Sequence, residues 1–372
     1  MFLSIITINF NNAEGLRKTL ASVASQTYPH IEHIIVDGGS TDESVEIIRQ
    51  YADNQAKGER LEAKGTENSK ADSNNNSTPI YTNLHNSTQP THIVRWISEK
   101  DTGIYNAMNK GLEIALGRRI VNEDHTSCLI ASSPHRLIAS DYIQILNSGD
   151  ILAAPDVTER MMVALQDNIK QQHNINNPSV VAQHTTTATE NNTSSPHRLT
   201  SDSDNASSPY QNRPAIFYGN MTKVNAAGQV VGKSGYTEYS LRQFYSSTLN
   251  HDCAYIRADL FEKYGLYDEN LKIVSDWKWY LQAIGLGSVK PEYVDIDVTI
   301  FDDGGISETN LELRNKERRQ VLEELLPPAV LWDYDTHAFE MEQMNRLRRW
   351  KLYPIVYFIE RVLSKLEKWL RT

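Results

Sequence analysis

Two short apolar runs alternate with two segments of helical periodicity in the first 51 residues, and this alternation constrains the fold more than any other feature. The runs Phe2–Ile8 and Ile31–Asp37 are rich in β-branched residues, which predicts two buried strands. Glu14–Gln26 and Ser44–Tyr51 space their apolar residues as one face of a helix does. A strand–helix–strand–helix order predicts a parallel sheet with right-handed crossover connections, and therefore an α/β fold.

Similar segments return further along the chain, between stretches of different composition. Later strands are predicted at 91–97, 142–146, 214–220 and 250–257, with a hairpin over 221–232 and helices over 104–115, 157–166 and 260–264. Three intervening stretches, about 52–90, 118–140 and 167–213, are polar. Segments with few large apolar side chains cannot bury enough surface to order strongly. We therefore expect one domain over 1–309 that carries three polar surface insertions.

Charge and cysteine content narrow the classes of function. The 372 residues carry a formal net charge of −10, which argues against a general nucleic-acid-binding role. Only Cys128 and Cys253 are present, which predicts a reducing compartment without a disulfide framework and excludes a cysteine-rich zinc site. No run of about 18 apolar residues occurs, and the apolar start lacks the length and basic flank of a signal peptide. We expect a cytoplasmic protein without a spanning helix.

The last part of the chain, 310–372, differs in character and is predicted to form a helical extension. Its segment 341–372 contains eight Lys or Arg residues against three Glu, together with many aromatic and aliphatic residues. A basic amphipathic stretch of this kind suits peripheral contact with an anionic membrane surface, here the cytoplasmic face of the inner membrane. The alternative is a helical hairpin that packs on the preceding domain and bends at Pro354.

The segment 141–152 contains the first candidate for chemistry. The apolar run Tyr142–Leu146 is cut off by Asn147, Ser148 and Gly149, and Asp150 follows at once. A carboxylate at the carboxyl end of a buried strand lies where α/β sheets bind their ligands. The alternative is that these residues form only a turn.

Two further aspartates are candidates for a site. Asp37 ends a predicted strand and precedes Gly38 and Gly39, which let a ligand approach the backbone closely, so its carboxylate could accept hydrogen bonds from a base or ribose. The alternative is that Asp37 only satisfies its own loop. Asp276 lies in the first turn of a predicted helix, where it is either an N-terminal cap or a general base at the mouth of a cleft.

Five segments occur in an order that resembles the family-2 glycosyltransferases. They are Ser4–Asn9, Ile35–Asp42, Ser98–Gly111, Leu146–Asp150 and Val274–Trp277. The likeness covers roughly 1–51, 91–117, 141–166 and 214–309 and is greatest to bacterial enzymes of capsule, exopolysaccharide and lipopolysaccharide assembly. It implies the GT-A fold, in which helices flank a Rossmann-like, mostly parallel central sheet. The C-terminal helical extension lies outside the likeness.

The resemblance assigns a nucleotide-sugar site to the first half of the sheet. It implies that Thr7 and Asn9 line the nucleotide pocket and that Asp37 hydrogen-bonds the base with help from Ser40. Two further residues, Lys100 and Asp101, would flank the uridine and ribose, and the donor would commonly be UDP-linked.

The segment 147–150 corresponds to the family's Asp-x-Asp region but departs from its simplest form. Asn147 and Gly149 occupy positions where carboxylates are expected, so Asp150 is the only carboxylate and the candidate ligand of Mg²⁺ or Mn²⁺. The likeness further implies that Asp276 is the general base, and His251 is a candidate contact to the diphosphate or acceptor. A single displacement would invert the anomeric configuration.

The predicted function is metal-dependent transfer of a sugar from a nucleotide-sugar donor to a glycan or lipid-linked acceptor hydroxyl in bacterial surface polysaccharide biosynthesis. A non-catalytic nucleotide-sugar-binding module is the alternative, supported by the missing first aspartate. A sugar nucleotidyltransferase is a further alternative, but it would be expected to carry a basic, Gly-rich phosphate loop, which the segment Asn9–Gly15 lacks.

Overall fold

The computed structural model of the chain describes residues 1–57, 92–121, 125, 127–129, 140–176, 213–225, 227–302, 310–351 and 353–370. Two compact units are present, Met1–Leu311 and Glu312–Thr372. Most of the three predicted insertions, namely 58–91, 130–139 and 177–212, lies outside the described residues. Their interpretation as surface insertions therefore stays a prediction.

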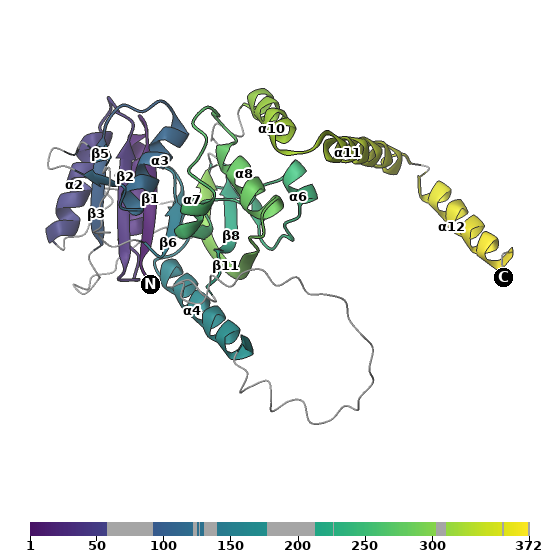
Figure 1. Cartoon of the computed structure of the whole chain (residues 1–372), viewed down its shortest axis with the longest axis horizontal. Helices are drawn as coiled ribbons and strands as arrows, with labels where there is room; N and C mark the ends of the chain where they lie inside the picture. The colour runs from purple at the N-terminus through teal and green to yellow at the C-terminus, as the bar shows by residue number, and fades with distance from the viewer. Residues whose placement is uncertain are drawn as a thin grey trace, which may run out of the picture. The chain divides into compact units, whose positions relative to one another are not determined.

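The first unit is built on a sheet of nine described strands (Figure 1). The order across the sheet is β3 (Ile93–Ser98), β2 (Ile31–Asp37), β1 (Leu3–Asn9), β6 (Tyr142–Ile145), β10 (Ala254–Arg257), β8 (Ile216–Val224), β11 (Pro291–Asp302) and β7 (Ile151–Leu152), with β9 (Val230–Ser234) paired to β8. β3, β2, β1 and β6 are parallel neighbours, and β8 and β11 run in the same direction. β7, β9 and β10 run in the opposite direction. The predicted α/β class with a mostly parallel sheet is confirmed.

Helices cover both faces of the sheet. They are α1 (Ala13–Ala24), α2 (Ser44–Lys57), α3 (Ile104–Ala115), α4 (Val157–Asn176), α6 (Leu241–Ser246), α7 (Asp259–Lys263) and α8 (Ser275–Tyr280), which continues as the π-helix η1 (Leu281–Gly285). On one face, Ile35 of β2 packs with Leu16 of α1 and Ile48 of α2. On the other face, Gly111 lets α3 approach β1 so closely that a Cβ atom there would overlap Ile6. A short second sheet pairs β4 (Arg119–Val121) with β5 (Ser127–Leu129).

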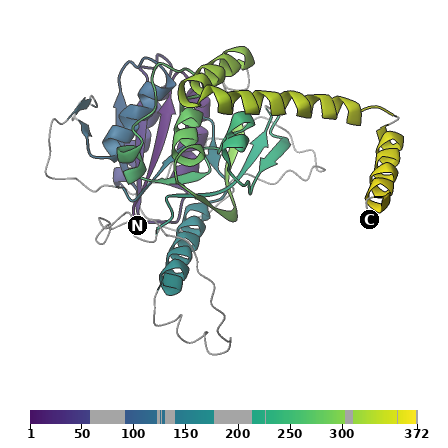
Figure 2. The same cartoon turned by 45° about the vertical axis from the view of Figure 1, so that its right-hand side comes forward.

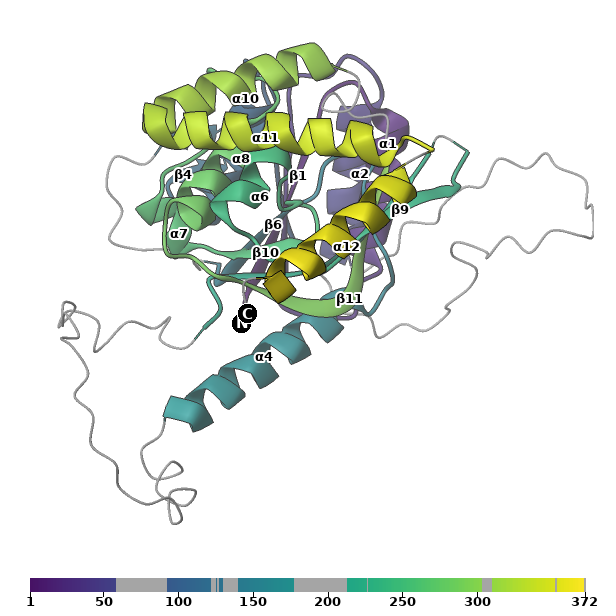
Figure 3. The same ribbon diagram turned by 90° about the vertical axis from the view of Figure 1, so that its right-hand side faces the viewer.

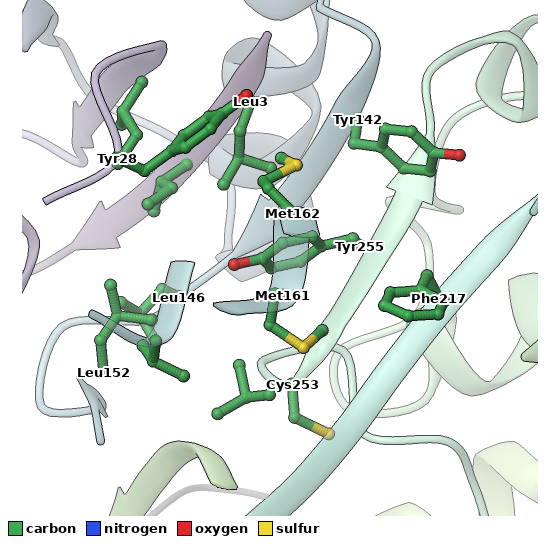
Figure 4. Packing of buried hydrophobic residues seen from close by; sticks show 14 of the residues in the cluster. Leu3, Tyr28, Tyr142, Leu146, Leu152, Met161, Met162, Phe217, Cys253 and Tyr255 are labelled. Atoms are coloured by element: carbon green, nitrogen blue, oxygen red, sulfur yellow. The ribbon is translucent and has the colours of Figure 1, made fainter. Parts of the chain in front are cut away.

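A core cluster lies under β1, β6, β8 and β10 and includes the first half of α4. Figure 4 shows Met161 and Met162 of α4 among Leu3, Tyr255 and Cys253. Beyond this core α4 runs on away from the sheet (Figure 2 and Figure 3), ten residues past the predicted end at 166. In the same way α2 continues to Lys57, past its predicted end at Tyr51. Each added helical residue gains one backbone hydrogen bond, so a packed first half extends into polar sequence.

The second unit consists of three successive helices, α10 (Leu311–Leu325), α11 (Pro328–Arg348) and α12 (Tyr353–Leu370). The predicted C-terminal helical extension is confirmed. The expected bend at Pro354 is shifted, because the helices break before Tyr353 and the proline lies in the first turn of α12. Proline is tolerated there, where its missing N–H has no intrahelical partner. None of the described helices is both long enough and apolar enough to cross a lipid bilayer.

We predict that α4 stabilises the fold only through its inward face. Leu165 is fully buried in the core cluster, whereas Val163 on the same helix is 51% exposed. Leu165→Ala should lower the free energy of unfolding by about 2–5 kcal/mol, and Val163→Ala should change it by less than about 0.5 kcal/mol. Urea unfolding followed by circular dichroism measures both. Equal effects of the two substitutions would contradict the packing described for α4.

Candidate active site

The ends of β1 and β2 meet at Asn9 and Asp37, which are paired across the parallel ladder. The Asp37 carboxylate is fully buried and accepts five hydrogen bonds. The donors are Asn9 Nδ2 (2.9 Å), the backbone N–H groups of Gly39 (3.2 Å) and Ser40 (2.9 Å), Ser40 Oγ (2.6 Å) and Ser98 Oγ (2.8 Å). A carboxylate offers about four lone-pair sites, so any bond to a base would replace one of these partners. Asp37 thus fixes the conformation of the 38–40 loop through hydrogen bonds to its backbone N–H groups and to the Ser40 hydroxyl.

The side chain of Thr7 lies away from this edge, in contrast to the prediction that it lines a nucleotide pocket. Thr7 is fully buried, and its Oγ1 is 3.0 Å from His33 Nε2. His33 Nδ1 in turn lies 2.9 Å from the hydroxyl of Tyr51. Burial, with a smaller contribution from His92, lowers the pKa of His33 to about 3, so this histidine is neutral. Alternate strand residues point to opposite faces, and Thr7 faces the α1–α2 layer with Ile5.

Lys100 and Asp101 do lie beside the 38–40 loop. Asp101 Oδ2 lies so close to Gly38 that a Cβ atom on Gly38 would overlap it, and Asp101 Oδ1 accepts from the Gly103 N–H at 3.0 Å. Burial raises the pKa of Asp101, and the charge of Asp37 adds to this effect. Lys100 is exposed, and its backbone packs on Gly39. The structure therefore brings together Asn9, Asp37, Ser40, Lys100 and Asp101, but not Thr7.

The 147–150 turn is fastened to α1 by Thr19, a residue that the sequence analysis did not single out. Thr19 Oγ1 accepts from the Gly149 N–H at 2.9 Å and lies 2.7 Å from the carbonyl oxygen of Asp150. Gly149 has a φ of +113°, which L-residues rarely adopt. The backbone of this turn thus requires glycine at the position where a second carboxylate would stand. Asp150 itself is buried, with 4% of its surface exposed.

His251 and Asp276 meet at the same edge of the sheet. His251 precedes β10, which is antiparallel to β6, so the start of β10 lies beside the end of β6. His251 Nε2 is 3.2 Å from Asn147 Nδ2, and His251 Nδ1 is 3.3 Å from Asp276 Oδ2. Asp276 Oδ1 accepts from the hydroxyl of Tyr105 at 2.8 Å. Four elements far apart in sequence thus contribute to one chain of polar contacts, Asn147–His251–Asp276–Tyr105, which we call the polar relay.

Electrostatics make His251 and Asp276 an ion pair. Burial alone would lower the pKa of His251, but the hydrogen bond and charge of Asp276, with the charges of Asp252 and Asp150, raise it to about 9. Burial alone would raise the pKa of Asp276, but the hydrogen bond and charge of His251, with Tyr105, outweigh it and lower this pKa. At neutral pH the imidazole is therefore protonated and the carboxyl group ionised.

A protonated His251 also decides the orientation of the Asn147 amide. Its Nε2–H is a donor and needs an acceptor, whereas Asn147 Nδ2 is a donor as well. Asn147 Oδ1 is buried without a hydrogen-bond partner. The two orientations of an amide have nearly the same shape, and turning it gives Oδ1 the His251 proton as a partner. Asn147 then accepts from an imidazolium.

Residues missed by the sequence analysis contribute through long-range contacts. Tyr105 is buried and lies at the edge of the apolar stripe of α3, about 20° from Leu112 around the helix axis, so the local pattern does not distinguish it from a core residue. Asp252 is buried next to His251, and its Oδ2 accepts from Thr299 Oγ1 at 2.9 Å. Burial raises the pKa of Asp252. Thr19 and Asp252 have partners 131 and 47 positions away, and no local pattern indicates such contacts.

The candidate metal-ligand atoms of Asn147, Asp150 and His251 suit a divalent cation only in part. Mg²⁺ and Mn²⁺ prefer oxygen ligands, and Mg²⁺ is commonly held by one or two carboxylates together with substrate phosphates. Asp150 supplies a carboxylate and Asn147 an amide oxygen, whereas protonated His251 offers no lone pair. Among the residues that the structure describes, no group of three or more His, Cys, Asp or Glu could hold a metal ion. The residues thus fit a cation that binds together with phosphates, with Asp150 as its protein carboxylate.

The family model and the relatives that this chain resembles are all described as glycosyltransferases. Residues 4–69 match the family model described as Glycosyl transferase family 2. An uncharacterized glycosyltransferase of Mycobacterium tuberculosis is 29% identical over 164 residues, which are 44% of this chain and 39% of the relative. A PGL/p-HBAD biosynthesis glycosyltransferase of Mycobacterium bovis is 33% identical over 114 residues, which are 31% of each chain. The chain thus spans less than half the length of these curated relatives.

Solved structures give weaker similarities. S. aureus TarS 1-349 in complex with UDP matches with a TM-score of 0.48 and 14% identity over 96% of this chain and 78% of that chain. The mannosyltransferase PcManGT of Pyrobaculum calidifontis, in complex with GDP-Man and Mn²⁺, matches with a TM-score of 0.43 and 12% identity over 98% of this chain and 86% of that chain. At TM-scores below 0.5 these similarities carry no argument about what this chain binds.

We predict that a side chain at position 149 strains the turn. Gly149→Ala and Gly149→Asp should each lower the free energy of unfolding by about 1–3 kcal/mol, because both force an L-residue into the conformation at φ +113°. The control is Gly232→Ala, whose added methyl group would have Lys223 Cβ at 3.9 Å as its nearest neighbour. Thermal unfolding measures all three variants. A gain in stability from Gly149→Asp would show that the turn is not strained by a side chain.

We predict that His251 titrates far above an ordinary histidine. NMR titration of its ring protons should give a midpoint of about 9, against 6.5 for a free side chain. In Asp276→Asn the midpoint should fall well below that of the wild type, because the hydrogen bond and the charge of Asp276, which contribute most to raising this pKa, are lost. Since the folded-state pKa of His251 is the higher one, its contribution to stability is complete below pH 6.5 and is lost as the pH rises through about 9. The pKa of Asp276 is lowered, so its contribution is complete above pH 3.8 and is lost as the pH falls below that value. A wild-type midpoint near 6.5 would rule out the ion pair.

Proposed function

We propose that this chain is a family-2 glycosyltransferase that transfers a sugar from a nucleotide-linked donor to an acceptor hydroxyl group, and the match of residues 4–69 to the model of that family supports this. The observation that carries the proposal is the polar relay. It lies at the carboxyl edge of β6, and the loop shaped by Asp37 lies at the same edge of the neighbouring parallel strands. In α/β sheets this edge is the one that binds ligands. The carboxylate of Asp276, which could act as a general base, and the protonated His251 thus lie at the same edge of the sheet as the 38–40 loop, where we propose that the nucleotide binds.

The nucleotide would bind at the 38–40 loop. Gly39 is partly exposed, Gly38 is buried against Asp101, and Asp37 holds the loop through its five hydrogen bonds. Asp101 lies against this loop and could accept hydrogen bonds from a ribose. We infer a UDP-linked donor from the resemblance of the segments around Asp37 and Asp101 to the family's motifs.

The diphosphate would lie next to the 147–150 turn. Asp150, with the Asn147 amide oxygen, would hold Mg²⁺ or Mn²⁺ there, and such a cation neutralises charge that develops on a diphosphate leaving group. His251 carries a positive charge at the same turn, 3.2 Å from Asn147. The protein therefore supplies one cationic side chain of its own where the leaving group gathers charge.

Asp276 is the proposed general base. Its carboxylate is ionised, 16% exposed, and held by Tyr105 on one oxygen and His251 on the other. The acceptor oxygen forms a bond to the anomeric carbon and gives its proton to Asp276. The bond between this carbon and the phosphate oxygen breaks, and the diphosphate leaves with the electron pair. A single displacement of this kind inverts the anomeric configuration.

The acceptor that we propose is a hydroxyl group of a glycan or a lipid-linked saccharide, in bacterial surface polysaccharide biosynthesis. One relative is named for PGL/p-HBAD biosynthesis, which supports a glycoconjugate product. We propose a cytoplasmic location, with support from Cys253, which is buried and unpaired as expected in a reducing compartment.

A non-catalytic nucleotide-sugar-binding module is the second candidate. Asn147 in place of the first aspartate favours it, and Gly149 stands at a second position where the family's pattern has a carboxylate. The polar relay argues against it, because a binding module has no need to hold a carboxylate and an imidazolium at the same edge.

We predict that Asp276 is needed for turnover but not for donor binding. With Mn²⁺ present, one of the UDP-, GDP- or dTDP-sugars should raise the unfolding temperature and be hydrolysed slowly. In Asp276→Asn hydrolysis should fall about 10²–10⁴-fold, the usual contribution of a general base, while the donor Kd stays within about threefold.

Two further variants test the role of Asp150 in metal binding and provide a control at a residue outside the candidate site. Asp150→Ala should abolish the effect of Mn²⁺ on donor binding, and the exposed Asp333→Asn should match the wild type in every respect. If no nucleotide sugar binds at any Mn²⁺ concentration, the transferase proposal fails. If a nucleotide sugar binds but the wild type does not hydrolyse it above the uncatalysed rate, the non-catalytic binding module is the better interpretation. If Asp276→Asn hydrolyses the donor as fast as the wild type, Asp276 is not the general base.

A further inference from the structure

Helix α12 presents one broad apolar face. Eight large apolar side chains fall on it, each between 41% and 73% exposed: Ile355, Val356, Phe358, Ile359, Val362, Leu363, Leu366 and Trp369. At 3.6 residues per turn these positions occupy an arc of about 160° around the helix axis. Single exposed apolar residues are common on protein surfaces, but a continuous face of this size marks an interaction surface.

The remaining arc of α12 is polar. It carries Glu360, Arg361, Ser364, Lys365 and Glu367, and the rings of Tyr353 and Tyr357 stack there with centroids 6.1 Å apart. Apart from Pro354 and the two tyrosines, whose hydroxyl groups are polar, no apolar residue lies on this arc, so the aliphatic, Phe and Trp side chains are confined to one face. A helix that is buried on all sides has apolar residues on all sides. Helix α12 instead has one apolar face and one polar face, as expected for a helix that covers a surface with one side only.

The charges around α12 are complementary to an anionic surface. The segment 341–372 carries a net charge of about +5 within a chain of net charge −10. Three arginines and a lysine, Arg346, Arg348, Arg349 and Lys351, directly precede the helix. Trp350 and Trp369, which are 63% and 73% exposed, flank the helix at its two ends. Tryptophan side chains prefer the interface between a bilayer and water, where their apolar body and polar N–H are both satisfied.

We propose that α12 binds in the plane of an anionic lipid bilayer, with its apolar face in the boundary between headgroups and acyl chains. The arc of about 160° is wider than the narrow seam through which two helices pair in a coiled coil, so a second copy would leave much of it exposed. A flat lipid surface covers the whole face, and the basic residues at the polar arc contact the headgroups. The inference goes beyond the transfer reaction and does not depend on it.

The test is sedimentation of the purified full-length chain with lipid vesicles. Vesicles of phosphatidylglycerol and phosphatidylethanolamine should bind it, vesicles of phosphatidylcholine should bind it at least tenfold more weakly, and added salt should weaken the binding. Arg361→Gln and Lys365→Gln should each weaken binding to the anionic vesicles about fivefold, with no change on phosphatidylcholine. No binding to phosphatidylglycerol vesicles at low salt would overturn the proposal.

Two double variants of one helix provide the matched control. Phe358→Gln with Leu363→Gln removes two apolar side chains from the face, and binding should fall about a hundredfold or more. Tyr357→Gln with Ser364→Gln changes the polar arc and should bind as the wild type does. Glutamine is a good helix former, so circular dichroism should show unchanged helix content in both. Equal binding by both double variants would overturn the proposal.

Light scattering without lipid tests the alternative that a second copy of this chain covers the apolar face of α12. A single-chain mass for the wild type supports the lipid surface. A dimer that Phe358→Gln with Leu363→Gln converts to a monomer would assign the face to a second copy of this chain and overturn the proposal. Donor binding is measured on the same samples, so failure of the transferase proposal and failure of this one give separate results.

Discussion

The ion pair between His251 and Asp276 is the interaction on which the arrangement of the site depends. A largely buried ion pair is tolerated only when hydrogen bonds satisfy its remaining polar atoms, and here Asn147 lies against one end and Tyr105 against the other. Each of the four residues comes from a different element, namely the end of β6, the approach to β10, α8 and α3. The contact between His251 and Asn147 depends on the antiparallel pairing of β10 with β6, because this pairing places the start of β10 beside the end of β6.

A second set of polar contacts sets the donor side of the same edge. Asp37 directs its five hydrogen bonds into its own loop and the neighbouring strand ends, so the 38–40 backbone has a defined shape before any ligand binds. The Thr19 hydroxyl does the same for the 147–150 turn from α1. A site whose groups are already held in place loses little conformational entropy on binding, which favours both affinity and correct orientation.

The charge balance of the site differs from that of a pattern with two carboxylates. Gly149 is required by the backbone, and Asn147 contributes a neutral oxygen, so Asp150 is the only carboxylate in this turn. The imidazolium of His251 adds positive charge close by. A turn with one negative side chain next to one positive side chain suits a diphosphate with a weakly held cation better than a cation held by protein ligands alone.

Local patterns in the sequence predicted most of the strands and helices and the polar residues at the ends of strands, but they did not predict β4, β5, β7 or the long strand β11. Periods of 2.0 and 3.6 residues and the chemistry of turns act over a few residues, so Asp37, Asp150 and the two faces of α12 could be predicted from neighbours alone. Only the tertiary structure decided that Thr7 faces inward, that Asp37 is saturated by its own loop, that Thr19 and Tyr105 contact the candidate site, and that His251 lies between Asn147 and Asp276. These contacts join residues up to 171 positions apart, and they depend on the strand order β1–β6–β10, which no local period encodes.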